Sequence, residues 1–318
     1  MNSRHLVDPK LDSFLDTYQP LEPSREALPQ IRQQRAFAIL DALRSLPSDG
    51  VTKTEHHIPS IQGAPPVRVL VYSPQNIRRP APTYMNIHGG GMIVGMPEQD
   101  EPANRRIAAE LGCIIVSPAY RLAPETNFPG PLDDCNTVLQ WIVENAADLG
   151  IDTQRLALGG ASAGGGLAAA LALKTRDEAK IRLALLLLVF PMLDDRTGSS
   201  REPAPYAGEF IWTAAQNHFA WNSYLGKPAG NDAFDPYAVP GRAEDLGRLP
   251  PTFIACGALD LFIEENIDFA RRLIHAGVPV ELHVYPGAYH AFQYVPTAKV
   301  TTTYRNDALR SLARAFKD

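Results

Sequence analysis

The most constraining feature of this chain is the stretch at residues 155–176, RLALGGASAGGGLAAALALKTR. Its start is a short apolar run, whereas residues 163–174 contain strong helix formers and no proline or β-branched residue, so a strand gives way to a helix at Ser162. Gly160 and Gly164 flank the serine. A sharp turn between a strand and a helix brings the two backbones into near contact and leaves no room for a Cβ, so glycine is needed on either side of the serine. The pattern predicts an exposed hydroxyl at a helix N-terminus, where negative charge is stabilised.

Two other interpretations of this stretch stay open. Ser162 could simply cap a helix in a glycine-rich turn. The run Gly164-x-Gly166-x-x-Ala169 also matches a dinucleotide fingerprint, which would make the protein a nucleotide-dependent oxidoreductase that binds NAD. Those glycines fall inside the expected helix and not in the turn before it, and no acidic residue closes a second strand at the required distance, so the nucleotide site is disfavoured.

Composition narrows the class of protein. Of the 318 residues, 45% are apolar and 20% are charged, which is typical of a globular protein. The net charge is −5, and the lysines and arginines are scattered without a basic stripe, so no nucleic-acid partner is expected.

The cysteines and the apolar runs indicate a compartment. Cys113, Cys135 and Cys256 lack the spacing of zinc ligands and are expected to be buried thiols in a reducing, cytoplasmic environment. The N-terminus has no apolar signal core, and the longest apolar run, residues 183–190, ends at Pro191 and is too short to span a bilayer. We therefore expect no stable membrane insertion.

Residues 1–48 form an N-terminal arm with two amphipathic helical patterns, at 9–18 and 28–46. Such an arm cannot bury its apolar face alone, so we expect it to lie on the main body as a lid or an interaction arm. Residues 51–60 and 67–73 alternate with a period of two, which predicts an antiparallel pair at a sheet edge. The adjacent His56 and His57 point to opposite faces of a strand and are interpreted as surface residues, not metal ligands.

From residue 83 onward, helical and strand patterns alternate, which predicts a mostly parallel sheet flanked by helices. Between residues 193 and 249 an insertion rich in aromatic side chains interrupts the alternation. Expected strands cover 83–88, 113–120, 155–158, 183–190, 252–256 and 280–285, and expected helices cover 102–111, 132–149, 163–174, 267–276 and 304–316.

Polar residues follow four of the expected strands, and the carboxyl ends of parallel strands meet at one edge of a sheet. These residues are the run His88-Gly89-Gly90-Gly91, then Ser162, Asp260 and His290. A serine hydroxyl is a weak nucleophile that needs a neighbouring base, and the base needs a carboxylate to fix its tautomer. The edge supplies one of each, in the order Ser, Asp, His. Taken singly, Asp260 could be a helix N-cap and His290 a solvent-exposed histidine.

An anion formed when Ser162 attacks a carbonyl group needs preorganised donors. We assign this oxyanion hole to the backbone N–H groups of Gly89, Gly90 and Ala163, because the glycine run can approach a substrate without side chains in the way. The alternative for the glycine run is a flexible loop.

Five motifs together resemble the hormone-sensitive lipase family of α/β hydrolases, in its microbial carboxylesterase branch, and the resemblance covers nearly the whole chain. The motifs are His88-Gly-Gly-Gly91, Tyr120-Arg-Leu-Ala-Pro-Glu125, Gly160-Ala-Ser-Ala-Gly164, Asp260-Leu-Phe-Ile-Glu-Glu265 and Tyr285-Pro-Gly-Ala-Tyr-His290. The resemblance implies an α/β-hydrolase fold with a catalytic domain at residues 49–193 and 226–318, and a cap made from the arm, residues 1–48, and an insertion, residues 194–225. It also implies a Ser162–Asp260–His290 triad that needs no metal or cofactor. Ala161 and Met92 depart from the residues frequent in the family, which leaves the shape of the pocket open.

The expected activity is hydrolysis of small-molecule carboxylic esters through an acyl-enzyme, on short-to-medium acyl groups. Met92, Phe210, Ile211 and Trp212 are expected to shape the substrate pocket. An amidase or peptidase with the same triad is the alternative among enzymes, and a non-catalytic small-molecule receptor on the same fold is the alternative outside them. The resemblance leaves a homodimer open.

Overall fold

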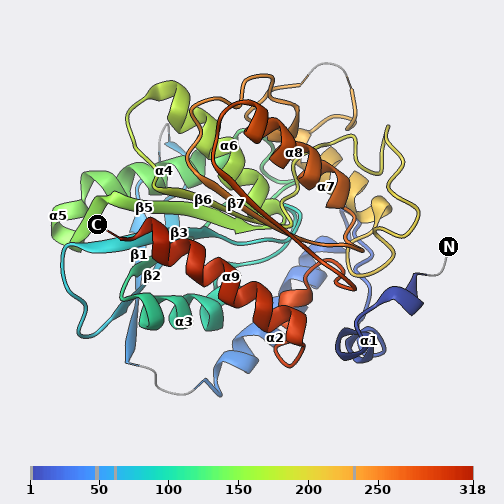
Figure 1. The fold of residues 1–318 in the computed structure, drawn as a ribbon, viewed down its shortest axis with the longest axis horizontal. Coiled ribbons are helices and arrows are strands. Elements are labelled where there is room, and N and C mark those ends of the chain that lie inside the picture. The colour runs from blue at the N-terminus through green and yellow to red at the C-terminus, as the bar shows by residue number, and fades with distance from the viewer. Residues whose placement is uncertain (1–2, 47–49, 61–62, 232–233, 318) are drawn as a thin grey trace.

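The computed structural model describes residues 3–46, 50–60, 63–231 and 234–317. Within them, an eight-stranded sheet has the order β1-β2-β4-β3-β5-β6-β7-β8 (Figure 1). β1 and β2 pair antiparallel at one edge, β2 pairs antiparallel with β4, and all other neighbours are parallel. The strands are β1 (Val51–Ile58), β2 (Val67–Pro74), β3 (Ala81–Ile87), β4 (Ile114–Ala119), β5 (Ile151–Ala161), β6 (Leu185–Val189), β7 (Thr252–Gly257) and β8 (Val280–Tyr285). The predicted mostly parallel sheet is confirmed.

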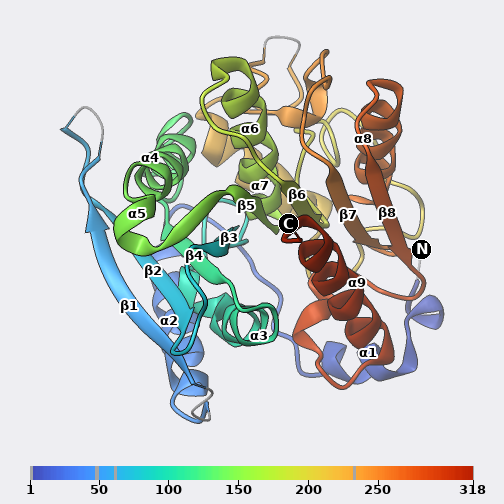
Figure 2. The same cartoon turned by 60° about the vertical axis from the view of Figure 1, so that its left-hand side comes forward.

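Helices cover both faces of this sheet. α3 and α9 pack on one face, and α4, α6 and α8 lie on the other (Figure 2). The α-helices are α1 (Pro9–Leu15), α2 (Leu28–Leu43), α3 (Glu101–Leu111), α4 (Gly130–Glu144), α5 (Ala146–Leu149), α6 (Ala163–Glu178), α7 (Ala214–Leu225), α8 (Ile263–His275) and α9 (Lys299–Ala315). Successive side chains of a strand point to opposite faces of the sheet, so each strand contributes to two hydrophobic cores. Tyr84 belongs to the core beneath α9, and its neighbour Met85 belongs to the core beneath α6. None of the helices in the described part of the chain is long and apolar enough to cross a lipid bilayer.

Several expected elements have different bounds. The single helix expected at 132–149 is interrupted at Asn145, which separates α4 from α5. α9 begins at Lys299 and not at residue 304, although its first turns contain β-branched residues that disfavour a helix. Packing explains the earlier start, because Thr301 is fully buried and its hydroxyl donates to the carbonyl of Phe292 at 2.9 Å. α8 likewise begins at Ile263, before the expected residue 267.

The two neighbouring histidines of β1 differ in how far they are exposed to solvent. His57 is exposed, as expected, but His56 is half-buried and its ring lies 5.3 Å from that of Trp141 on α4. His56 therefore reaches the surface only in part, with one side of its ring covered by α4. The three cysteines are buried free thiols, as predicted.

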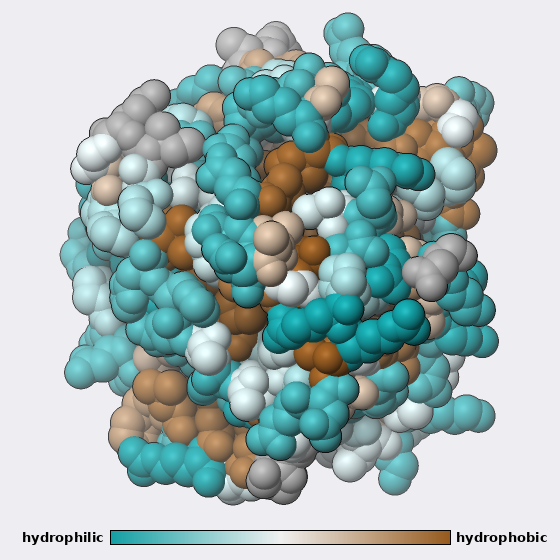
Figure 3. All heavy atoms as spheres, turned by 90° about the vertical axis from the view of Figure 1, so that its left-hand side faces the viewer, coloured by the Kyte–Doolittle hydropathy of each residue, from teal (hydrophilic) through white to brown (hydrophobic). Residues whose placement is uncertain are grey.

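The N-terminal arm crosses the molecule and reaches both cores. Leu11 on α1 packs into the core beneath α9, whereas Leu28 at the start of α2 packs into the core beneath α6, and both are fully buried. α2 also exposes Phe37 and Leu40 to solvent. Figure 3 shows a compact hydrophobic patch at the lower left, on the side where α2 lies in Figure 2.

Candidate active site

Ser162 lies in the tight turn between β5 and α6. Its backbone has φ 56° and ψ −123°, a conformation that few residues other than glycine adopt. A Cβ on Gly160 would lie 2.3 Å from the carbonyl oxygen of Ile87, and one on Gly164 would lie 2.0 Å from the same atom. Both positions therefore require glycine, for the steric reason predicted from the sequence. The strained turn presents the serine side chain at the carboxyl edge of the sheet.

Two loops bring a histidine and an aspartate to this serine. Nε2 of His290, after β8, lies 3.0 Å from Oγ of Ser162, and Nδ1 lies 2.9 Å from Oδ2 of Asp260, after β7. A carboxylate can only accept hydrogen bonds, so Nδ1 carries a proton and Nε2 is the acceptor for the serine hydroxyl. Asp260 is fully buried, and its other oxygen accepts from the amide of Phe262 at 2.9 Å.

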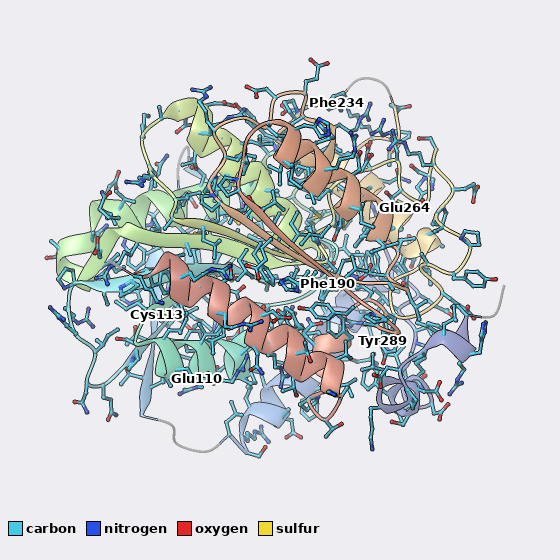
Figure 4. The ribbon with its side chains drawn as sticks, viewed as in Figure 1. Glu110, Cys113, Phe190, Phe234, Glu264 and Tyr289 are labelled. Atoms are coloured by element: carbon cyan, nitrogen blue, oxygen red, sulfur yellow. The ribbon has the colours of Figure 1, made fainter. Side chains whose placement is uncertain are left out.

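Aromatic rings surround the imidazole of His290. The ring centroids of Phe190 and Phe262 lie 4.7 and 5.3 Å from it, both edge to face, and Trp212 lies 6.2 Å away. Figure 4 labels Phe190 and Tyr289, the residue before His290. These rings leave the imidazole 5% exposed and fix its orientation towards the serine.

The glycine loop after β3 lies against the same turn. A Cβ on Gly89 would be 3.4 Å from Cβ of Ser162. Within the described residues, the backbone N–H groups of Gly89, Gly90 and Ala163 donate no hydrogen bond. These three predicted donors are therefore available to a ligand next to the serine oxygen.

A buried histidine shapes this glycine loop from below. Burial lowers the pKa of His88 to about 4, so its ring is neutral. Nδ1 lies 2.9 Å from the carbonyl oxygen of Gly89, and the ring stacks on Tyr120 at 4.2 Å. The Tyr120 hydroxyl donates to the carbonyl of His88 at 3.0 Å. A carbonyl acceptor requires the Nδ1–H tautomer, and this bond holds the Gly89 carbonyl in place.

A cavity of about 380 Å³ opens above the serine. Of the predicted pocket residues, Ile211 and Trp212 line it, but Phe210 and Met92 do not. Phe210 instead packs on Tyr289, with ring centroids 6.0 Å apart, and Met92 is buried in the core beneath α6. The assignment of Phe210 and Met92 to the pocket was therefore wrong, because adjacent residues in an irregular segment point in different directions.

Other lining residues were missed from the sequence. α2 contributes Arg35, Ala38, Ile39 and Ala42, whose spacing of three to four residues places them on one helix face. The amphipathic pattern at 28–46 indicated such a face but not what it would cover. Residues Gln293 and Tyr294, just after His290, also line the cavity.

Glu265, on α8, is another residue near the site whose role the sequence did not predict. It is half-buried, and its carboxyl group accepts from the amide of Leu193 at 2.7 Å and from the hydroxyl of Thr197. Burial raises its pKa well above the usual range. It thereby ties α8 to the segment that leaves β6, whose Met192 amide donates to the carbonyl of Ser162 at 3.0 Å. The motif that begins at Asp260 contains this glutamate, but the sequence does not show what it contacts.

Known proteins resemble this chain over its whole length. A family model for the α/β hydrolase fold matches residues 84–294. The carboxylesterase NlhH of Mycobacterium tuberculosis is 32% identical over 319 residues, which cover 98% of this chain and 96% of that protein. The arylesterase of Saccharolobus solfataricus is 29% identical, with 95% and 97% covered. A solved structure of a bacterial heroin esterase is 36% identical, superposes with a TM-score of 0.93 and covers 100% of both chains.

Proposed function

The chain belongs to the α/β-hydrolase family, in its branch of hormone-sensitive-lipase-type carboxylesterases, and we propose that this serine ester hydrolase works through Ser162, His290 and Asp260. The observation that carries the proposal is the unbroken contact from Asp260 through His290 to the Ser162 oxygen, at 2.9 and 3.0 Å. Such a relay gives a neutral hydroxyl the base it needs for attack on a carbonyl carbon.

In the first half of the reaction, Nε2 of His290 takes the proton of Ser162 while Oγ bonds to the ester carbon. The carbonyl oxygen becomes an anion that accepts from the amides of Gly89, Gly90 and Ala163. When this intermediate collapses, the bond to the alcohol oxygen breaks and His290 returns its proton to that oxygen. Asp260 keeps its negative charge throughout and stabilises the imidazolium.

In the second half, a water molecule attacks the acyl group on Ser162. His290 takes one proton from the water as the new bond forms, and gives it to Oγ when the acid leaves. The same amides stabilise the second anion. Each proton removed is returned, so the enzyme ends in its starting state.

We propose short-to-medium acyl esters as substrates. The cavity of about 380 Å³ is closed on one side by Trp212, because the indole lies directly over Gly91, where a Cβ would be 2.4 Å from it. Ile211 and the inner face of α2 restrict the remaining space. A cavity of this size supports a compact substrate and not an extended lipid chain.

The test is a series of p-nitrophenyl esters from acetate to laurate, with Ser162→Ala and a control, Ser45→Ala, at an exposed residue just after α2. Ser162→Ala should lower kcat/KM by about three or more orders of magnitude, and adding His290→Ala should cost little more because the two residues act as a unit. Additive losses would contradict the assignment, and a maximum at laurate would contradict the substrate class.

Two further measurements address the alternatives. A fluorophosphonate probe should label the wild type and Ser45→Ala but not Ser162→Ala, whereas a non-catalytic receptor would not be labelled at all. Rates on a matched ester and amide distinguish an esterase from an amidase, and we expect the ester to be strongly preferred.

A further inference from the structure

Of the charged groups around the cavity, the carboxylates have partners or reduced charge, whereas one arginine has no carboxylate partner. Glu98 lines it but is 4% exposed and accepts from both terminal nitrogens of Arg68, which also pairs with Glu55 at 2.9 Å, so Glu98 is engaged in an ion pair. Behind Tyr294, whose hydroxyl lies 3.5 Å from Asp100, burial raises the pKa of that aspartate to about 7 and so reduces its negative charge at neutral pH. Neither carboxyl group presents a full unpaired charge to the cavity.

Arg35 is the cation at this cavity that lacks a carboxylate partner. It lies on the inner face of α2, one turn after Arg32, whose guanidinium is fully engaged by the carboxylate of Glu125 at 2.8 and 2.9 Å and by two backbone carbonyls. Arg35 instead faces the phenol groups of Tyr18 and Tyr294 at the mouth of the cavity. No carboxylate in the described ranges lies within ion-pair distance of Arg35.

Arg35 has a phenol partner in Tyr18 but no carboxylate partner, and such a cation attracts an anion that enters the same space. The two phenols beside it, and Trp212 and Ile211 elsewhere on the cavity wall, carry no charge that would compete for an anion. We infer that Arg35 determines specificity by favouring esters that carry a carboxylate at the end remote from the scissile bond. The inference rests on the proposed function, because it concerns the substrate class of that same site.

The test compares matched esters with and without a carboxylate. On the acyl side the pair is mono-4-nitrophenyl adipate and 4-nitrophenyl heptanoate, and on the alcohol side it is 4-acetoxybenzoate and its methyl ester. The readout is the ratio of kcat/KM for the charged ester to that for the neutral one, after spontaneous hydrolysis is subtracted. The variants are Arg35→Gln, the charge-preserving Arg35→Lys, and a control, Arg44→Gln, at the exposed end of the same helix.

Arg35→Gln should lower the ratio about fivefold in one of the two pairs, since a solvent-accessible ion pair is worth up to about that factor. Arg35→Lys should keep most of the ratio, and Arg44→Gln should leave it unchanged. The affected pair identifies which side of the ester faces Arg35. An unchanged ratio in both pairs, or an equal loss with Lys and Gln, would overturn the inference. If no wild-type ester hydrolysis occurs at all, the proposed function itself has failed.

Discussion

The neutral imidazole of His88 sets a dependence of stability on pH. Its pKa is about 4 in the folded protein because of burial, below its ordinary value of 6.5. Below pH 6.5 the unfolded chain therefore binds a proton that the folded chain does not, and stability falls as pH falls, until about pH 4, where both states are protonated. The shift corresponds to about 3 kcal/mol, which is fully present only above pH 6.5.

The prediction is tested with His88→Asn. Urea unfolding at pH 7 and pH 4.5 should show that the wild type loses about 2 to 3 kcal/mol more than the variant over this interval, since Asn cannot titrate. Acids such as Asp100 and Glu265, whose pKa values desolvation raises, change stability in the opposite direction, so the comparison must be between variant and wild type. His275→Asn on α8 is the control. Parallel pH profiles for wild type and His88→Asn would refute the prediction.

Among the elements, the segment before α7 is held in an unusual conformation. Ile211 is β-branched yet has φ 65°, and the amide of Trp212 donates to the carbonyl of Phe210 at 2.7 Å, so the three residues form a strained γ-turn. The hydroxyl of Tyr18, on the arm, donates to the carbonyl of Ile211 at 3.2 Å. This contact joins the arm to the insertion across the cavity.

Tyr18→Phe should therefore loosen the turn and let Ile211 withdraw from the cavity. A hydrogen bond of this kind contributes about 1 kcal/mol, so we expect the rate on longer acyl esters to rise about two- to fivefold relative to acetate. The chain-length series measures this directly. Tyr206→Phe, at an exposed tyrosine of the same segment, is the control. If the two profiles coincide with that of the wild type, Tyr18 does not hold the turn.

At the scale of the whole molecule, the sequence predicted the parts that depend on local pattern. The turn at Ser162 follows from Gly160 and Gly164, and the parallel sheet follows from the alternation of elements. Which side of the irregular segment faces the cavity could not be predicted, because the γ-turn at Ile211 goes against the preference of a β-branched residue. The role of Arg35 was missed for a related reason, since an amphipathic pattern shows a helix face but not its neighbour.

The arm also determines how the molecule unfolds. Leu11 lies in one core and Leu28 in the other, and the carbonyl of Leu11 accepts from the hydroxyl of Tyr289, beside His290, at 2.9 Å. An arm anchored in both cores should unfold together with the body, not open as a separate lid. Leu11→Ala and Leu28→Ala should each lower the free energy of unfolding by about 2 to 5 kcal/mol, because each leaves a cavity in a packed core.

Urea titrations followed by circular dichroism and by residual ester hydrolysis measure this cooperativity. The two signals should fall together in the wild type and, at lower urea, in both variants. Phe37→Ala, at a side chain that is 68% exposed on the same arm, is the control and should leave the midpoint nearly unchanged. If hydrolysis in Leu11→Ala is lost well before the helices unfold, the arm is an independent lid, and its contacts with the two cores do not couple it to the sheet.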